Sequence, residues 1–264
     1  MNKIFNCDCI EGMKKLADNS VDMILCDPPY QLTEFSWDKS LNLENLFSEC
    51  CRVLKPCRCI ALFAVEPFAS KLRTCKADWY KYDWIWIKNK AANYQNAKCA
   101  PLRIYENILI FSDGKTSPGN ANNMLYNPQG VIEITPCVKE SHDIHFGRKT
   151  YRQKLGSEYV QTQKNYQKNI LNFSIPNNKE RLHSTQKPVD LLEYLIKTYS
   201  NVGEVVLDFT CGSGSTCVAA VNTDRQFIGI ELDEHYFEVA CDRVAKAMQS
   251  KAQPKLFEDI GNEK

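Results

Sequence analysis

Residues 204–232 read EVVLDFTCGSGSTCVAAVNTDRQFIGIEL. An apolar, strand-like run is followed by a glycine loop, a helix-like segment and a second apolar run that ends at Glu231. Glycines in such a loop permit a tight turn and a close approach of a ligand to the backbone, and the next helix offers N–H groups at its start. A carboxylate at the end of the following strand can accept hydrogen bonds from ribose hydroxyls. The stretch therefore predicts a strand–loop–helix–strand unit with a nucleoside-cofactor site.

The residues of this loop narrow the choice of cofactor. A dinucleotide fingerprint needs a small residue where Cys217 stands, and a Walker loop needs lysine where Ser215 stands. Asp208 places an anion at the end of the first strand, which repels a pyrophosphate but suits the ammonium of an amino acid. A ligand with a ribose, a cationic amino-acid end and no phosphate is S-adenosylmethionine, which we predict as the cofactor.

Alternating strands and helices are predicted over much of the remaining chain. Apolar runs predict strands at residues 3–7, 21–26, 59–65, 82–87 and 106–111, and helical periodicity appears at 41–54, 67–77 and from Pro188. With the two later strands, this pattern predicts an α/β fold with a mostly parallel sheet. Because the middle of the chain is rich in Asn, Gly, Gln, Lys and Tyr, we divide the chain into residues 1–111, an insert at 112–182, and residues 183–264.

Composition limits the class of protein. The chain has 264 residues and a formal net charge of +1, so any nucleic-acid footprint must be local. Its 13 cysteines include no Cys-x-x-Cys pair, which argues against a zinc site or a disulfide scaffold and suits a reducing cytosol. No signal-like segment and no apolar run of about 18 residues is present, so we expect a cytoplasmic protein away from the membrane.

A second informative stretch, VDMILCDPPYQL, covers residues 21–32. Neither Pro28 nor Pro29 can donate to a sheet ladder, and Pro28 pushes Asp27 into an extended conformation, so the predicted strand ends here. Taken alone, Asp-Pro-Pro-Tyr is more often a proline-terminated strand than a functional site.

Taken together, Asp27-Pro28-Pro29-Tyr30 and the Phe-x-x-Gly-x-Gly loop resemble the amino-group DNA methyltransferases, which methylate the exocyclic nitrogen of adenine or cytosine. Three further segments match that family: NCDCIEGMKKL around Asp8, WDK from Trp37, and HSTQKPVDLLEYLI from His183. The order of catalytic motif, polar insert and cofactor loop resembles the permuted beta arrangement of the family. The resemblance implies a Rossmann-like, seven-stranded, circularly permuted methyltransferase sheet with an inserted target-recognition region. In the loop, Thr210 and Cys211 depart mildly from the more usual small residues.

The chemistry gives each catalytic residue a role. Asp27 and the carbonyl of Pro28, held by the rigid pair with Pro29, can accept the two N–H bonds of an amino group, which frees the nitrogen lone pair for in-line attack. Tyr30 can stack on a base flipped out of the duplex. The resemblance implies that Asp8 contacts the adenine of the cofactor and that Glu231 contacts its ribose. It also implies that Thr185 and Lys187 contact the carboxylate of its methionine part. The full predicted cofactor set is Asp8, Asp208, Phe209, Cys211, Gly212, Gly214, Glu231, Thr185 and Lys187.

The insert is the predicted DNA-contact region. Residues 139–187 contain ten Lys or Arg against four Asp or Glu, interleaved with aromatic residues, and basic side chains neutralise phosphates. Trp37, in the loop after the catalytic motif, could close over the pocket or simply anchor the loop. The predicted DNA-binding residues are Trp37, Arg148, Lys149, Arg152, Lys154, Lys164 and Lys168. His142 and His145 have a His-x-x-His spacing but no further ligands, so no metal site is predicted.

These features predict a site-specific DNA methyltransferase that acts on adenine N6, because family members with Asp before Pro-Pro-Tyr mostly act on adenine. The alternatives are a cytosine-N4 enzyme, an RNA or protein-amide methyltransferase, a nicotinamide-dependent oxidoreductase and a non-catalytic nucleic-acid-binding module. Cys217 and Asp208 argue against the oxidoreductase, and the intact motif at Asp27 argues against the non-catalytic module. The expected partner is double-stranded DNA, and a cognate restriction endonuclease and a homodimer stay open.

Overall fold

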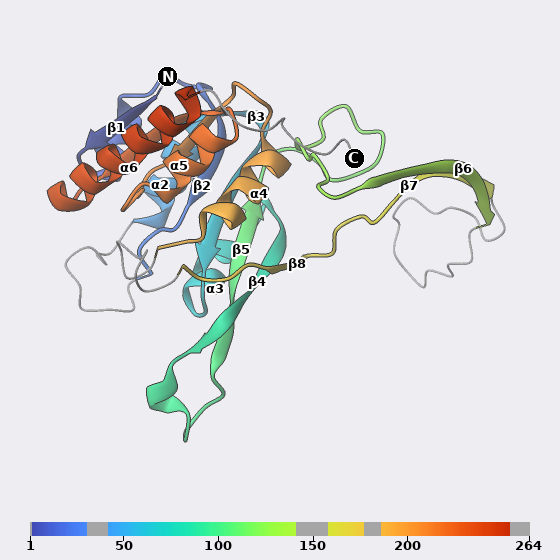
Figure 1. The fold of residues 1–264 in the computed structure, drawn as a ribbon, viewed down its shortest axis with the longest axis horizontal. Helices are drawn as coiled ribbons and strands as arrows, with labels where there is room; N and C mark the ends of the chain where they lie inside the picture. The colour runs from blue at the N-terminus through green and yellow to red at the C-terminus, as the bar shows by residue number, and fades with distance from the viewer. Residues whose placement is uncertain (1, 31–41, 141–157, 177–185, 254–264) are drawn as a thin grey trace, which may run out of the picture.

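A computed structural model describes residues 2–30, 42–140, 158–176 and 186–253 (Figure 1). An eight-stranded sheet with the order β1-β10-β9-β2-β3-β5-β4-β8 forms its centre. The strands are β1 (Lys3–Asn6), β2 (Val21–Cys26), β3 (Leu54–Ala64), β4 (Tyr80–Ala92), β5 (Arg103–Phe111), β8 (Ile170–Asn172), β9 (Val205–Asp208) and β10 (Gln226–Glu231).

The sheet is mostly parallel, as the sequence predicts. β1, β10, β9, β2 and β3 run in one direction, and β5 is antiparallel to both β3 and β4. The strands expected at seven places along the chain are all present in the sheet. An eighth, short strand, β8, comes from the insert and pairs with β4 through Ile85↔Ile170, at the edge of the sheet. The predicted α/β class and mostly parallel sheet are confirmed.

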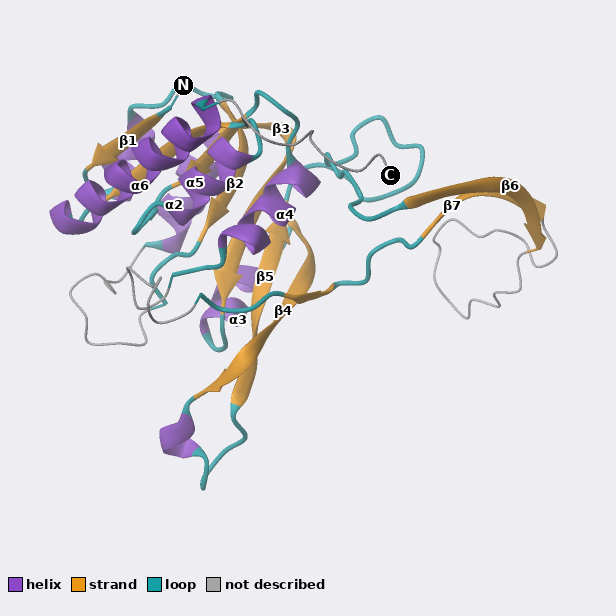
Figure 2. Ribbon diagram, in the orientation of Figure 1, coloured by secondary structure: helices purple, strands orange, loops and turns teal. Residues whose placement is uncertain are grey.

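Helices cover both faces of the sheet (Figure 2). They are α1 (Cys9–Lys14), α2 (Leu43–Val53), α3 (Phe68–Cys75), α4 (Val189–Tyr199), α5 (Ser215–Asn222) and α6 (Glu234–Ala252), with a 3-10 turn η1 (Tyr94–Asn96). The alternation of β2 divides the core in two: Met23 and Leu25 pack with α4, α5 and α6, whereas Ile24 and Cys26 pack with α1, α2 and α3. Burial of each large apolar side chain contributes about 1.5–3 kcal/mol, so both layers stabilise the sheet.

Local capping signals set several helix starts. The side chain of Asp233 accepts a hydrogen bond from the Tyr236 N–H (3.1 Å) and so caps the start of α6. Asn42 caps α2 in the same way through the Asn45 N–H (3.0 Å). Pro188 stands at the N-cap position of α4, where a missing N–H costs nothing.

The insert contains more regular structure than its composition indicates. β6 (Ile132–Glu140) and β7 (Glu158–Lys164) form an antiparallel hairpin apart from the main sheet (Figure 1). The sequence patterns predict no strand between residues 112 and 182, whereas the structure has β6, β7 and β8 there. Most side chains of the hairpin are exposed on both faces, so neither face packs on a core. The division of the chain at residues 112–182 stays a prediction.

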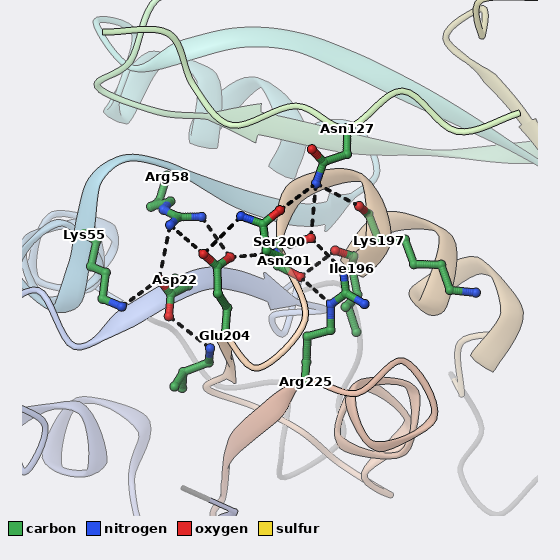
Figure 3. Close-up of polar contacts among 11 residues, drawn as sticks. Asp22, Lys55, Arg58, Asn127, Ile196, Lys197, Ser200, Asn201, Glu204 and Arg225 are labelled. Atoms are coloured by element: carbon green, nitrogen blue, oxygen red, sulfur yellow. Dashed lines mark hydrogen bonds and ion pairs between the residues drawn. The ribbon is translucent and has the colours of Figure 1, made fainter. Parts of the chain in front are cut away.

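A polar network ties together the amino ends of β2, β3 and β9 (Figure 3). The Asp22 carboxylate accepts from Lys55 Nζ (2.7 Å) and from the Val205 N–H (3.0 Å). Arg58 donates two hydrogen bonds to Glu204, at 2.9 and 2.7 Å, which is the bidentate geometry that guanidinium and carboxylate groups favour. We call Asp22, Lys55, Arg58 and Glu204 the amino-end network. Ion pairs in this network connect the starts of these three strands.

No helix among the described residues is both long and apolar enough to cross a bilayer.

Candidate active site

The carboxyl ends of β2 and β9 form the point where the order of the sheet reverses. The two strands are neighbours, but the chain continues from β2 to β3 on one side and from β9 to β10 on the other. In open α/β sheets, ligands bind in the crevice outside the carboxyl ends of the strands at such a point. Asp27 directly follows β2, and Asp208 is the last residue of β9. The two predicted motifs therefore meet at the place where this fold binds ligands.

Asp27 is held from three directions. Tyr30 Oη donates to its Oδ1 (2.5 Å), and Lys187 Nζ donates to its Oδ2. The hydroxyl of Thr210, in the glycine loop, donates to the backbone carbonyl of Asp27 (3.2 Å). The side chain of Asp27 nevertheless keeps 22% of its surface exposed. The structure thus fixes the carboxylate in place and leaves part of it open to a ligand.

Lys187 stands behind Asp27 and is itself buried, with 8% of its side chain exposed. Its Nζ lies 3.5 Å from Glu106 Oε2, and Glu106 Oε1 is ion-paired with Lys88. Burial alone would lower the pKa of Lys187, but Asp27 and Glu106 raise it, so the ammonium stays charged. We call Asp27, Tyr30, Lys187, Glu106 and Lys88 the Asp27 network. Its four charges alternate in sign and cancel.

Glu106 and Lys88 were not found by sequence reasoning. Burial would raise the pKa of Glu106, yet Lys187 and Lys88 hold it below its usual value. The signal in the sequence is weak but real: Glu106 interrupts the apolar run of β5, and Lys88 follows the alternating run of β4. A charge inside a strand of a buried sheet needs a partner, but the sequence does not say which one.

The glycine loop between β9 and α5 needs glycine at two positions. Gly212 and Gly214 have φ of +51° and +77°, in the left-handed region that L side chains rarely adopt. A Cβ on Gly214 would lie 2.9 Å from the Ala240 Cβ of α6, whereas a Cβ on Gly212 would meet no heavy atom within 4 Å. Gly214 therefore allows close helix contact, and Gly212 faces open space where a ligand can approach.

Two further groups hold this loop. The Glu231 carboxylate, at the end of β10, accepts from the N–H groups of Gly212 (2.7 Å) and Asp233 (2.9 Å). From α6, Arg243 donates to the Ser213 carbonyl (2.5 Å) and to the Ser215 hydroxyl (3.1 Å). Glu231 was predicted from the sequence, but Arg243 was not. Arg243 lies about 30 residues after the loop in the chain, and nothing in the α6 sequence links the two.

The acidic groups around the loop fit S-adenosylmethionine. Asp208 is buried, and burial raises its pKa to about 6, since no cation among the described residues pairs with it. An ammonium group would supply that missing charge. Burial also raises the pKa of Glu231, and Asp8 is exposed while its Oδ1 caps α1 through the Ile10 N–H (2.9 Å). Because β1 is paired with β10, Asp8 and Glu231 follow neighbouring strand ends, as two contacts to one adenosine require.

Two predicted cofactor residues turn their side chains away from the open face of the loop. Phe209 is fully buried in the core with α1, α2 and α3. Cys211 is buried beside Cys217, and both sulfurs lie 3.0 Å from where a Cβ on Gly229 would stand. These residues could meet a cofactor through their backbone only.

Two of the predicted DNA-contact residues lie in the described part of the insert. Lys164 ends β7, and Lys168 is exposed in the segment before β8. The other predicted residues that lie outside the described residues are Trp37, Arg148, Lys149, Arg152, Lys154 and Thr185. The His142 and His145 pair also lies outside them. In the described part of the chain, no group of three or more His, Cys, Asp or Glu side chains is arranged to hold a metal.

The sequence and the fold of the chain are similar to those of known DNA methyltransferases. The Type II methyltransferase M.HpaI of Haemophilus parainfluenzae is 27% identical over 254 residues, covering 90% of this chain and 72% of M.HpaI. The crystal structure of the M1.HpyAVI–SAM complex superposes with a TM-score of 0.62 at 23% identity, covering 92% of this chain and 99% of that one. The cytosine-N4-specific PvuII DNA methyltransferase superposes with a TM-score of 0.64 at 12% identity, covering 94% and 91%. The fold is therefore that of DNA methyltransferases that use S-adenosylmethionine.

The model of the N6 and N4 methyltransferase family, described as DNA methylase, matches residues 21–242. That range includes the motif at Asp27, the insert and the glycine loop. The chain therefore belongs to the N6/N4 DNA methylase family.

Proposed function

We propose that the protein transfers the methyl group of S-adenosylmethionine to the exocyclic amino group of a base flipped out of double-stranded DNA, and that the base is adenine, methylated at N6. The observation that carries the proposal is the placement of Asp27. Its carboxylate is fixed by Tyr30 and Lys187 at the strand-order reversal, directly beside the glycine loop, and part of it stays exposed. Membership of the family supports the reaction class.

On the cofactor side, four groups have distinct roles. S-adenosylmethionine, when bound, supplies an electrophilic methyl group on a sulfonium. Asp208 holds the amino-acid ammonium, Glu231 accepts from the ribose hydroxyls, and Asp8 accepts from the adenine amino group. The backbone at Gly212 lets the ligand approach, because a side chain there would be strained and would enter the open space.

On the acceptor side, an exocyclic amino nitrogen is a poor nucleophile because its lone pair is delocalised into the ring. Asp27 and the Pro28 carbonyl accept its two N–H bonds, which favours a pyramidal nitrogen whose lone pair can point at the methyl carbon. Each carboxylate oxygen has more than one lone-pair site, so Asp27 can accept this bond while Tyr30 and Lys187 remain in place.

Lys187 keeps Asp27 an anion and fixes its direction. A carboxylate paired in this way is a weak base, which is sufficient, because the amino proton can leave after the N–C bond has formed and the S–C bond has broken. Burial and the Asp27 charge raise the pKa of Tyr30, so its hydroxyl stays protonated and donates to Asp27. The Tyr30 ring lies 5.5 Å from that of Phe68, which supports one of its faces, and we assign the flipped base to the other.

The preference for adenine rests on Asp27 in the resemblance to the family, since members with Asp before Pro-Pro-Tyr mostly act on adenine. The fold does not discriminate, because the cytosine-N4-specific PvuII enzyme shares it. M.HpaI is a Type II methyltransferase. A site-specific activity with a cognate endonuclease is the corresponding proposal for this chain.

The decisive experiment incubates the protein with methyl-labelled S-adenosylmethionine and mixed-sequence duplex DNA, digests the DNA to nucleosides and identifies the labelled nucleoside. We expect N6-methyldeoxyadenosine. Label in N4-methyldeoxycytidine would replace adenine by cytosine and leave the rest of the proposal intact. No label in DNA, with label in RNA or protein supplied in parallel, would contradict the DNA substrate.

A further inference from the structure

The hairpin between β4 and β5 extends well beyond the sheet that carries it (Figure 1). β8 last pairs with β4 at Ile87, and β3 last pairs with β5 at Asn107. Beyond those points β4 and β5 pair only with each other, as far as Ala92↔Arg103. We call residues 89–104 the arm. At about 3.3 Å per residue, its first five residues alone reach roughly 17 Å from the sheet.

The arm is strongly basic for its length. It contains Lys90, Lys98 and Arg103 and no acidic residue, so its 16 residues carry +3 while the remaining 248 residues of the chain carry −2. Lys90 and Lys98 are exposed, and no carboxylate among the described residues forms an ion pair with any of the three cations. The tip adds amide side chains and Tyr94, which is 66% exposed. Cations on a projecting ribbon that have no carboxylate partner among the described residues indicate an anionic partner.

The described part of the insert does not have this character. β6 and β7 together contain Lys139 and Lys164 against Glu133, Glu140 and Glu158, a net charge of −1. The basic residues that the sequence assigned to DNA contact are mostly outside the described residues. Among the described residues, the arm is thus a basic surface that this assignment overlooked.

The arm leaves the sheet at the same edge as the predicted catalytic motif. β4 and β3 are both antiparallel to β5, and β3 is parallel to β2, so β4, β3 and β2 run in the same direction. The arm follows the carboxyl end of β4 and therefore leaves the sheet at the edge where Asp27 follows β2. At its root, Lys88 pairs with Glu106, and Glu106 faces Lys187, the partner of Asp27. Asp27 and the root of the arm are therefore connected through this chain of ion pairs and lie at one edge of the sheet.

We propose that the arm binds the sugar–phosphate backbone of duplex DNA next to the target base, with Lys90, Lys98 and Arg103 as phosphate contacts. A two-stranded ribbon has the width that a DNA groove of about 12 Å accepts. The inference rests on the proposed function, because it takes duplex DNA as the substrate. It adds a surface that holds DNA from the side opposite the glycine loop.

The test compares two double variants that remove the same charge. Lys90→Gln/Lys98→Gln changes the arm, and Lys81→Gln/Lys115→Gln changes two lysines at the opposite edge, one of them at the start of the same strand β4. Surface substitutions of this kind change stability by about 0.5 kcal/mol or less, so both variants should fold. Binding of a mixed-sequence duplex is measured without S-adenosylmethionine, from about 50 to 200 mM salt, by fluorescence anisotropy.

Each phosphate contact contributes about 0.9 to the slope of log K against log salt, so the arm variant should lose about 1.8 from the slope and bind roughly 30-fold more weakly at 0.15 M salt. Adding Arg103→Gln should remove about 0.9 more. The control variant should bind like the unchanged protein, and all variants should bind S-adenosylmethionine equally. If the unchanged protein binds DNA but the arm variant keeps its slope, the arm proposal is wrong. If the unchanged protein does not bind duplex DNA, the proposed function fails and the arm proposal fails with it.

Discussion

β2 has a carboxylate at each end, and the two are surrounded in opposite ways. Asp22, at the amino end, is 3% exposed, while its partners Lys55 and Arg58 are 40% and 20% exposed. Asp27, at the carboxyl end, is 22% exposed, while its partner Lys187 is 8% exposed. At one end the anion is inside and the cations reach water. At the other end the cation is inside and the anion faces out.

This difference separates a structural ion pair from a binding site. The Asp22 oxygens accept hydrogen bonds from Lys55 and from the Val205 N–H. Because its partner cations remain partly solvated, the free-energy cost of burying this ion pair is lower. Asp27 is oriented from behind by a buried ammonium, which leaves its outer side for a ligand. A counter-ion behind a carboxylate is the arrangement that preorganised electrostatic stabilisation needs, because the group is already oriented before the substrate arrives.

The largest expected effects come from exchanging each of these carboxylates for alanine. Asp27→Ala should lower the rate of methyl transfer by about 10³-fold or more, because an amino-group acceptor aimed at the reacting nitrogen is lost. Its affinity for S-adenosylmethionine should be nearly unchanged, since the proposed cofactor groups follow other strands. Single-turnover rates and equilibrium binding of labelled cofactor measure the two effects.

Asp22→Ala is the matched control at the other end of the strand. It should lower the free energy of unfolding by about 2–4 kcal/mol, because the Val205 N–H and two cations lose their acceptor, with part of the cost offset by the exposed cations. Its turnover per folded molecule should stay within about threefold of the unchanged protein, a free-energy change below about 1 kcal/mol. Urea unfolding gives the stability. Wild-type turnover in Asp27→Ala, or lost turnover without lost stability in Asp22→Ala, would contradict the division of roles.

The parts of the molecule that were predictable are those determined by neighbours in the chain. The strand before Gly212, the cap at Asp233 and the break after Asp27 each depend on a few adjacent residues, so the sequence predicts them directly. β6 and β7 were missed because their strands bury little surface, and β8 was missed because it has only three residues. Hydrogen bonds to a partner strand define them, and that partner is remote in sequence.

The same distinction applies to the site. Asp27 and the glycines were found because their motifs are contiguous. Glu106, Lys88 and Arg243 were missed, since a charge in a strand or helix shows that a partner is needed without naming it.

Lys187 is a partial case. Its motif marked it as a site residue, and the structure places it against Asp27, whereas the contact to the cofactor carboxylate stays a prediction.

The next largest effect is expected from Lys187→Gln, which removes the buried counter-ion of Asp27 and leaves a neutral side chain of similar length. We expect the turnover number to fall about 100-fold, equivalent to about 2.7 kcal/mol, because Asp27 loses its orientation, while the affinity for S-adenosylmethionine changes little. If Lys187 instead holds the cofactor carboxylate, the affinity falls and turnover at saturating cofactor persists. Lys197→Gln, on the exposed side of α4, is the control and should change neither quantity.

A smaller difference is expected between the two glycines that flank β9. Gly203 and Gly214 have similar φ, +82° and +77°, but a Cβ on Gly203 would meet nothing within 4 Å and a Cβ on Gly214 would lie 2.9 Å from Ala240. Gly203→Ala should cost about 1–2 kcal/mol of stability from the left-handed backbone alone. Gly214→Ala should cost about 1–3 kcal/mol more, because α6 must move, and should also weaken cofactor binding. Equal losses in urea unfolding would show that the contact with α6 is unimportant.

The smallest effect should be seen in the pH dependence of cofactor binding. The pKa of Asp208 is raised to about 6 by burial, so below that pH the free protein carries a protonated carboxyl that an ammonium ligand must deprotonate. Affinity for S-adenosylmethionine should therefore fall by about tenfold between pH 7 and pH 5, a range in which an α-amino group stays charged.

Weaker binding of S-adenosylmethionine at low pH indicates a carboxylate, because protonation of Asp208 removes the negative charge that attracts the ammonium group. Asp208→Asn should bind more weakly at pH 7 and lose most of the pH dependence. The pKa of Glu231 is also raised by burial, so Glu231→Gln is the matched variant, and it should keep the change near pH 6 because ribose hydroxyls are neutral. A pH dependence that disappears in Glu231→Gln and persists in Asp208→Asn would move the ammonium contact from the end of β9 to the end of β10. Asp208 and Glu231 would then exchange their proposed roles, while the role proposed for Asp27 would not change.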